Sequence, residues 1–309
     1  MKRFYLFIFS LFAINANAQS LTDGLMMPKG SFCTGFLYTH DQWKNYWEGG
    51  LKRDNQNIGT ITTTSITWMG NYGVSDRLNI IAMVPYVKTK ASSGTLTGLE
   101  GIQDLSVSGK YRLLAKNFGT SGLRAFAVGT VSTPLTNYTP DYLPLSIGMA
   151  STNFSTRLTG NYHLESGWYI NISGAYTMRT NVTLDRPSYY SDGSIYFTNE
   201  VDMPNTFDFS TMLGYYKKGV QAELYYSQQN TLGGGDIRRQ DMPFVSNRMN
   251  FSKAGALLMY YLPRPKNLAV RASVSYTVAG RNVGEATTLM GGLLYTFHLS
   301  SKTEITPQP

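Results

Sequence analysis

Apolar and polar residues alternate along most of this chain from residue 31 onward. In residues 101–114, for example, Leu105, Val107 and Tyr111 share one parity, while Asp104 and Lys110 share the other. A period of two is typical of a β-strand whose two faces meet different surroundings. Such segments recur with turn residues between them, and no amphipathic helix pattern competes with them. The expected strands are residues 31–40, 58–72, 77–90, 103–116, 122–134, 148–163, 168–181, 205–216, 219–230, 247–262, 268–280 and 285–298.

The connections between these strands are alternately short and long. The short ones are 73–76, 117–121, 165–167, 217–218 and 263–267. The long ones are 41–57, 91–102, 135–147, 182–204 and 231–246, and only the last outer turn, near 281–284, is short. Short periplasmic turns that alternate with long extracellular loops are typical of bacterial outer-membrane barrels, which have an even number of strands. The sequence therefore predicts an all-β fold, a closed antiparallel up-and-down transmembrane β-barrel of about twelve strands.

In such a barrel the apolar row of each strand faces lipid and the other row faces the lumen. In the strand from residue 148, Phe154, Leu158 and Tyr162 belong to the apolar row, and Asn153 and Arg157 belong to the polar row. A register slip of one residue would place charged side chains in lipid at about 2–4 kcal/mol each near the midplane. The ionic residues expected to line the lumen are Asp104, Lys110, Arg112, Arg124, Arg157, Glu223 and Arg271. These side chains either pair and brace the wall or line a path for polar solutes.

Aromatic residues on the lipid-facing parity gather near the strand ends, as in the aromatic girdles of membrane barrels. Trp168 and Tyr176, for example, are eight residues apart on one strand. At ~3.4 Å per residue and a tilt of ~40°, this separation corresponds to roughly 20 Å across the membrane. The alternative, a secreted soluble β-sandwich, usually has strands about half as long. Strand length therefore favours the membrane barrel.

The first residues predict export from the cytoplasm. Lys2 and Arg3 precede an apolar run over residues 4–14, and Ala16-Asn17-Ala18 forms an A-x-A cleavage site. This order is typical of a secretory signal peptide, which is too short to span a bilayer as a helix. We expect a signal peptide over 1–18, cleaved after Ala18, and a bacterial outer-membrane location. The remaining expected regions are an N-terminal periplasmic segment over 19–30, the barrel over 31–298 and a polar C-terminal tail over 299–309.

The composition is rich in tyrosine and glycine and poor in charge. Tyr and Gly number 22 and 30, whereas only 15% of the residues are charged. The formal net charge of +8 is spread along the chain, without a basic cluster of the kind that binds nucleic acid. Cys33 is the only cysteine, so the chain forms no intrachain disulfide. Stability must therefore come from closure of the sheet or from a packed core.

Two stretches carry a family signature. They are "YGVSDRLNIIAMVPYV", residues 72–87, and "GIQDLSVSGKYRLL", residues 101–114. Together they resemble the phenol-degradation-pathway (MetA pathway) outer-membrane channel family. The residues that match its motifs include Gly73, Asp76, Arg77, Pro85 and Tyr86 in the first stretch, and Gly101 and Tyr111 in the second. The resemblance implies an outer-membrane barrel that admits small, often apolar compounds.

The sequence offers little catalytic or metal-binding chemistry. Its histidines, His40, His163 and His298, lie on different expected strands. A barrel lipid hydrolase would have to use His163 as its inward base, but no serine motif marks a partner. The carboxylates of residues 182–204 match no calcium-binding motif. We therefore expect no catalytic residues, no metal and no cofactor.

The function predicted from these features is a passive outer-membrane channel for small molecules, apolar or aromatic ones among them. The first alternative is a closed structural or surface-interaction barrel whose long loops bind an external partner. The second is the barrel lipid hydrolase. The expected partners are outer-membrane lipid, small-molecule solutes and the barrel-assembly machinery, and no nucleic acid.

Overall fold

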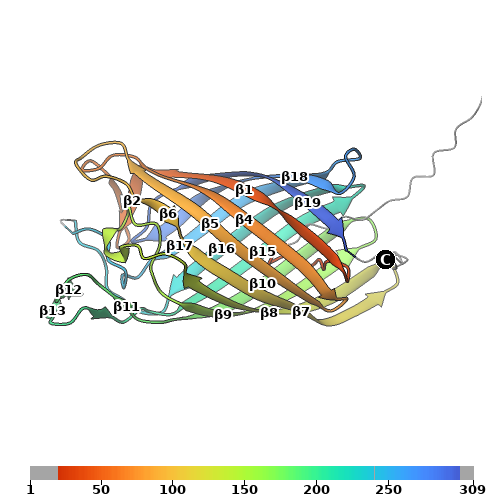
Figure 1. Cartoon of the computed structure of the whole chain (residues 1–309), viewed down its shortest axis with the longest axis horizontal. Helices are drawn as coiled ribbons and strands as arrows, with labels where there is room; N and C mark the ends of the chain where they lie inside the picture. Colours follow the sequence, from red (N-terminus) through yellow and green to blue (C-terminus); the bar gives the residue numbers. More distant parts are fainter. Residues whose placement is uncertain (1–19, 240, 300–309) are drawn as a thin grey trace, which may run out of the picture.

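The computed structural model describes residues 20–239 and 241–299, and these fold into one closed antiparallel β-barrel of twelve long strands (Figure 1). The strands are β1 (Ser31–Trp43), β4 (Ile61–Ser75), β5 (Leu78–Ala91), β7 (Asp104–Phe118), β8 (Ser121–Pro134), β9 (Asn153–Leu164), β10 (Trp168–Arg179), β15 (Thr206–Lys217), β16 (Val220–Thr231), β17 (Asn250–Tyr261), β18 (Leu268–Arg281) and β19 (Thr287–His298). The predicted all-β barrel and its strand number are confirmed. The expected signal peptide with its cut after Ala18, and the tail beyond Leu299, lie outside the described residues.

Each strand pairs with its neighbours in the sequence, and the first strand closes the barrel against the last. β1 pairs with β4 on one side, where Phe32 lies opposite Tyr72, and with β19 on the other, where Ser31 lies opposite His298. Every pairing of the barrel is antiparallel, so the topology is up-and-down. Closure leaves no edge strand with unpaired backbone groups, which a strand in lipid could not tolerate.

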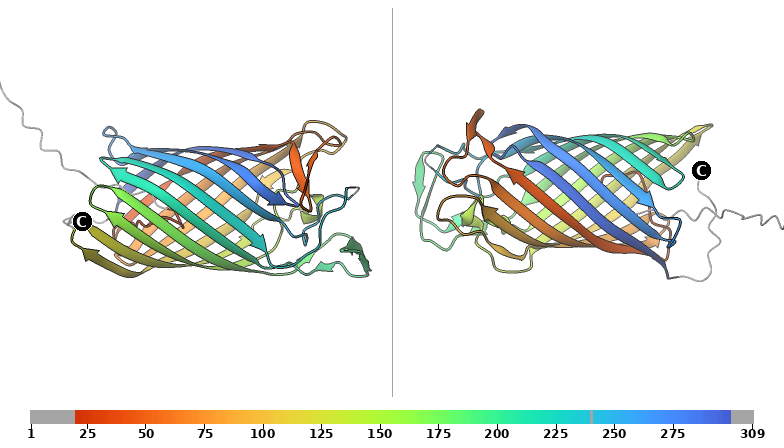
Figure 2. Two further views of the ribbon diagram at one scale, coloured as in Figure 1. Left: turned by 180° about the vertical axis from the view of Figure 1, so that it is seen from behind. Right: turned by 90° about the horizontal axis from the view of Figure 1, so that it is seen from above.

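The turns and loops sort to opposite ends of the barrel (Figure 2). The short turns are 76–77, 119–120, 165–167, 218–219 and 262–267. The long loops are 44–60, 92–103, 135–152, 180–205 and 232–249, and the last outer turn, 282–286, is short. The loops carry β2 (Asn45–Glu48), β3 (Leu51–Asp54), β6 (Glu100–Ile102), the 3-10 helix η1 (Pro140–Tyr142), β11 (Val182–Thr183), β12 (Tyr189–Ser191), β13 (Ser194–Tyr196) and β14 (Glu200–Val201). Some strands are longer than expected. β1, for example, ends at Trp43 rather than at residue 40, because the first residues of the outer loop continue the strand pairing beyond the alternating segment.

The outer face of the barrel is apolar. Phe36, Leu158 and Leu224 expose 60%, 59% and 64% of their surface, and similar side chains follow on the same parity of the other strands. A continuous exposed apolar band of this kind is covered by a bilayer in transmembrane barrels. The rings of Trp168 and Tyr215 pack edge to face near the short turns, with their centroids 5.2 Å apart, as expected for an aromatic girdle. In the described part of the chain, no helix is long and apolar enough to cross a membrane.

Candidate functional site

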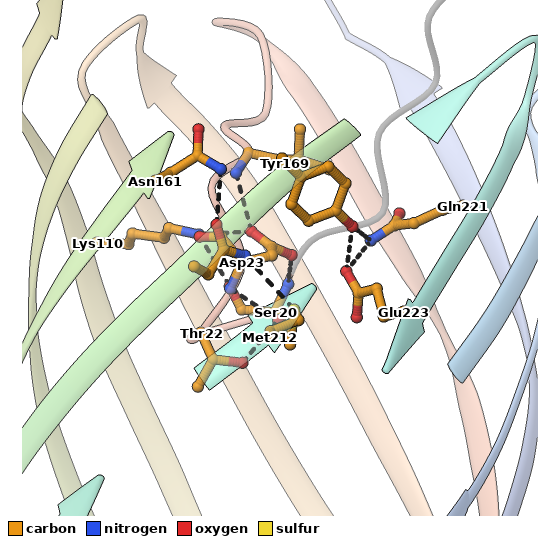
Figure 3. A network of polar contacts seen from close by, with 11 residues as sticks. Ser20, Thr22, Asp23, Lys110, Asn161, Tyr169, Met212, Gln221 and Glu223 are labelled. Atoms are coloured by element: carbon orange, nitrogen blue, oxygen red, sulfur yellow. Dashed lines mark hydrogen bonds and ion pairs between the residues drawn. The ribbon is translucent and has the colours of Figure 1, made fainter. Parts of the chain in front are cut away.

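The lumen contains a segment of the chain that precedes the first strand. Lys110, in the middle of β7, is completely buried, whereas Val107 and Tyr111 on the opposite parity are exposed. Its ammonium nitrogen Nζ donates to the carbonyl oxygens of Ser20 (2.9 Å) and Asp23 (2.8 Å) and to the Asp23 carboxylate (2.7 Å) (Figure 3). These three acceptors match the three donors of an ammonium group. Residues 20–30 are called the N-terminal plug below.

The plug crosses the lumen from one wall to the other. Gly24 lies against β9, where an added Cβ would come within 2.3 Å of the Asn161 side chain. Met27 has no exposed surface and belongs to an apolar cluster on the opposite wall. The strands of that wall are β1, β4, β17, β18 and β19. That cluster comprises Met27, Cys33, Leu37, Met69, Leu257, Met259, Ala269 and Leu294. The ribbon views agree, since the start of the described chain runs inside the barrel near the short turns (Figures 1 and 2).

Backbone contacts seat the C-terminal part of the plug on β4. The amide of Gly30 donates to the carbonyl of Gly73 at 2.8 Å, and the amide of Ser31 donates to the carbonyl of Pro28 at 3.1 Å. A Cβ on Gly73 would lie 2.1 Å from the Pro28 carbonyl oxygen, so this approach requires glycine. Glycine at position 73, a residue of the family signature, therefore has a structural role in holding the plug.

This arrangement differs from the periplasmic segment expected over residues 19–30. Residues 20–28 lie inside the barrel rather than below it. The physical reason is the pairing of Asp23 with Lys110, which lies 87 residues further along the chain. Residues 20–28 have no periodic pattern, so their sequence does not indicate the contact between Asp23 and Lys110.

A second polar group braces the wall beside the plug. The Tyr169 hydroxyl donates to the Glu223 carboxylate, and the Gln221 amide donates to the same carboxylate oxygen at 2.7 Å (Figure 3). Glu223 is only 5% exposed. The Glu223 carboxyl group is thus held by hydrogen bonds across the inner face of β15, which lies between β10 and β16.

The other ionic residues expected in the lumen do not form one cluster. Asp104 accepts a 2.5 Å hydrogen bond from the Tyr138 hydroxyl of loop 135–152, and burial beside this carboxylate raises the pKa of Tyr138, so the hydroxyl keeps its proton. Arg157 of β9 donates to the Ser173 hydroxyl of β10 at 2.9 Å. Two further pairs lie within electrostatic range of each other: Arg112 with Arg124, and Arg271 with Glu223. The contacts of Asp104 and Arg157 favour wall bracing at those two positions.

Sequence reasoning missed charged residues that share these walls. Asp208 of β15 faces both Arg157 and Arg179, and Lys253 of β17 lies 4.0 Å from Asp41 of β1. A signal was present for Asp208, because it interrupts an aromatic stretch at the parity of the polar row. Arg179, at the very end of β10, also has the parity of the polar row.

The outer loops pack over the other end of the barrel. Thr89, a buried residue of β5, donates its hydroxyl to the Leu145 carbonyl at 2.7 Å. Leu145 is itself completely buried and packs with Ile58 and Ile61. Loop 135–152 therefore folds into the barrel mouth. A separate apolar cluster joins loops 180–205 and 232–249: Val182, Leu184, Tyr189, Val201, Met203, Phe244 and Val245.

A cavity of about 420 Å³ lies in the lumen beside loop 135–152. Its lining is mostly polar, with hydroxyl groups from β4, β7 and β8 on both sides of an apolar strip on β5. The lining residues are Thr63, Ser65, Thr67, Met83, Pro85, Val87, Gln103, Asp104, Ser106, Ser132 and Ile147. Its volume lies within the range of small-molecule sites.

The remaining signature residues shape the wall and its turns. Pro85 lines the cavity, and Gly101 approaches it, since a Cβ there would lie 3.3 Å from Ile147. Tyr86 and Tyr111 are exposed on the apolar face. Asp76 and Arg77 form the turn between β4 and β5, where the Arg77 amide donates to the Ser75 hydroxyl at 3.2 Å.

Catalytic and metal-binding groups do not converge. His298 contacts the Ser31 hydroxyl at 3.1 Å, His40 contacts Gln42 at 3.4 Å, and His163 lies beside Gly122 on another part of the wall. The histidines therefore belong to three separate places. Within residues 20–239 and 241–299, no group of three or more His, Cys, Asp or Glu side chains is arranged to hold a metal ion.

Comparison with solved structures finds similar β-barrels at different levels. An outer membrane channel from Pseudomonas putida F1 superposes with a TM-score of 0.69 at 15% identity, covering 88% of this chain and 97% of that one. The KdgM porin and the translocator domain of the autotransporter NalP from Neisseria meningitidis give TM-scores of 0.43 and 0.45, both at 9% identity. They cover 85% and 88% of this chain and 99% and 90% of their own. At 15% identity the likeness to the Pseudomonas putida channel concerns the fold alone, and the two TM-scores below 0.5 carry no argument.

The family comparison is more specific. No curated protein matches the chain significantly. A family model, in contrast, matches residues 54–291, which include both signature stretches, most of the barrel wall and the loops around the cavity. The chain therefore belongs to the family described as "Putative MetA-pathway of phenol degradation".

Proposed function

We propose that this protein is a passive channel of the bacterial outer membrane for small molecules. The observation that carries the proposal is the way the lumen is filled. A cavity of about 420 Å³ lies inside a barrel with an apolar outer band, and a tethered segment, the N-terminal plug, crosses the lumen nearer the short turns. Barrels of about eight strands are filled by their own side chains, whereas a wider barrel leaves space for solutes.

The lining of the cavity supports small, amphipathic solutes. Ser65, Ser106 and Ser132 offer hydroxyl groups, while Met83 and Ile147 offer apolar surface. Apolar or aromatic molecules that carry one polar group would contact both kinds of surface. The family description, which refers to phenol degradation, agrees with such solutes.

The proposed setting requires lipid and assembly partners. The exposed apolar band must be covered by outer-membrane lipid, because water would not solvate it favourably. Phe297 lies near the end of β19 and is 45% exposed on the apolar face. In this proposal, the barrel-assembly machinery recognises this aromatic strand end.

The test is solute entry into liposomes that contain the full mature chain. Swelling rates are measured with aromatic, fatty and sugar solutes, and discrete conductance steps are sought in planar bilayers. The folded state is checked first by heat-modifiable mobility on gels. We expect faster entry of small aromatic solutes than of sugars. Folded protein that admits no solute and shows no conductance, even without residues 20–28, would contradict the proposal.

A second candidate is a closed surface-interaction barrel, which the buried cluster in loops 180–205 and 232–249 favours. An ordered outer surface of this kind is what an external partner requires. Impermeable, correctly folded protein would support this alternative. The hydrolase alternative predicts lipid cleavage that disappears in H163Q, and folded wild-type protein without such activity would dismiss it.

A further inference from the structure

Lys110 has an unusual set of partners for a charged residue in a barrel wall. Its ammonium is completely buried and bonds to three oxygen atoms of the N-terminal plug, with the Phe126 ring centroid at 5.1 Å on the wall side. Removal of the plug would leave a cation in the lumen without these oxygen partners. Water would then solvate the ammonium, and an anion in the place of the Asp23 carboxylate would restore the charge-assisted hydrogen bond.

The two halves of the plug are held by different forces. Residues 27–30 are fixed by the apolar packing of Met27 and by the backbone bond from Gly30 to Gly73. Residues 20–23 are held by polar contacts to Lys110, which water and solutes are able to exchange. Leu25, between the two halves, is only partly buried. The polar contacts of the first half can therefore be exchanged while the second half remains anchored.

The surroundings favour an anion at this position. The neighbouring carboxylate, Glu223, is already satisfied by Tyr169 and Gln221. A cationic solute would be repelled by Lys110, and a neutral solute would not replace the charge of Asp23. A small carboxylate offers the same charge-assisted hydrogen bonds as the Asp23 side chain.

From these contacts we infer that Lys110 is the binding site of the channel for a small carboxylate, and that Asp23 occupies this site as an internal stand-in for the solute. A carboxylate that enters the lumen competes with Asp23 for Lys110 and releases residues 20–24. This inference rests on the proposed channel function and names both a class of solute and the residue that recognises it.

The experiment records single channels of the full mature chain in planar bilayers. Potassium acetate or potassium benzoate replaces potassium chloride at constant ionic strength. We expect either carboxylate to raise the open probability of the wild-type protein. D23N is expected to be open in chloride alone, with an open probability at least about tenfold higher than that of the wild type.

Two lysine variants separate recognition from mere loss of a bond. K110Q is expected to open as well, but it should lose its response to acetate, and its reversal potential should move toward cations relative to D23N. The matched control is K253Q, because Lys253 also pairs loosely with an aspartate at 4.0 Å, from a different wall. K253Q should respond to acetate like the wild type.

The outcomes distinguish this inference from the channel function itself. The inference is wrong if a variant lacking residues 20–24 conducts while neither acetate nor D23N changes the closed state of the full chain. If the truncated barrel is folded and never conducts, the channel function fails first. The acetate measurement uses only wild-type protein, so it decides the matter even if D23N does not fold.

Discussion

Replacement of Gly73 by alanine tests whether the seat of the N-terminal plug controls the pore. Gly73 lies on the inner face of β4, and its missing side chain leaves room for the backbone of residues 27 and 28. The new Cβ would lie 2.1 Å from the Pro28 carbonyl oxygen and 2.9 Å from that of Met27. Either the strand or the plug must move.

The plug is the weaker of the two. β4 is hydrogen-bonded along its length to β1 and β5, whereas the seat of the plug depends on the Gly30 to Gly73 bond and the packing of Met27. A relief of the clash requires a shift of about 1 Å in the plug backbone. Overpacking of this kind costs about 1–3 kcal/mol, which lowers plug occupancy roughly 5- to 150-fold.

The assay is conductance in planar bilayers at matched protein density, together with heat-modifiable gel mobility as a check of folding. G73A is expected to conduct in chloride without any carboxylate present. The control is G291A on β19, since a Cβ on Gly291 meets nothing within 4 Å. Both variants make the same chemical change in a strand, and only G73A disturbs the plug.

A folded G73A barrel with the conductance of the wild type would refute this reasoning. It would mean that the plug yields without leaving the pore, so its position does not control ion flow. Conductance in both G73A and G291A would also refute it, because the effect would then come from the wall.

Three further predictions concern the membrane face, the plug anchor and the outer loops. L158R places a charge on the exposed face of β9 and should lower the free energy of unfolding by about 2–4 kcal/mol. This value is measured by urea titration in lipid vesicles, and an unchanged value would contradict the assigned face. M27A should weaken the buried anchor by about 2–5 kcal/mol and raise conductance while the barrel stays folded; a closed M27A would contradict the role of this packing. Burial alone would raise the pKa of Asp236, but hydrogen bonds from Arg281 and Asn282 outweigh it and lower the pKa. A carboxyl with a lowered folded-state pKa contributes stability above its unfolded value and loses it as the pH falls through the folded value. Pepsin cleavage of loop 232–249 should therefore rise below about pH 4. D236N should show the raised cleavage already at higher pH, and equal cleavage of both proteins at every pH would contradict the prediction.

The barrel was predictable because its signal is local. Alternation within each strand identifies the lipid-facing row, and the sorting of short and long connections sets the topology. Strand ends were less accurate, as at Trp43 of β1, because tertiary contacts of the outer loops decide where pairing stops.

The site was predictable only where it depends on strand parity. Parity places Lys110 and Glu223 on the polar row, but it does not show that Lys110 binds a plug while Glu223 braces the wall. The plug depends on a contact between residues 23 and 110, and the cavity depends on loop 135–152 folding into the mouth. Neither feature leaves a periodic mark in the sequence.

The position of Cys33 gives the molecule a built-in reporter. Cys33 is the only cysteine of the chain, and its side chain is buried in the same cluster as Met27. We expect a thiol reagent in the lumen to react slowly with Cys33 while this cluster is intact, and faster once Met27 has moved out of it. The rate of covalent labelling of unmodified protein in intact cells thus records the position of the anchor, independently of any current through the pore.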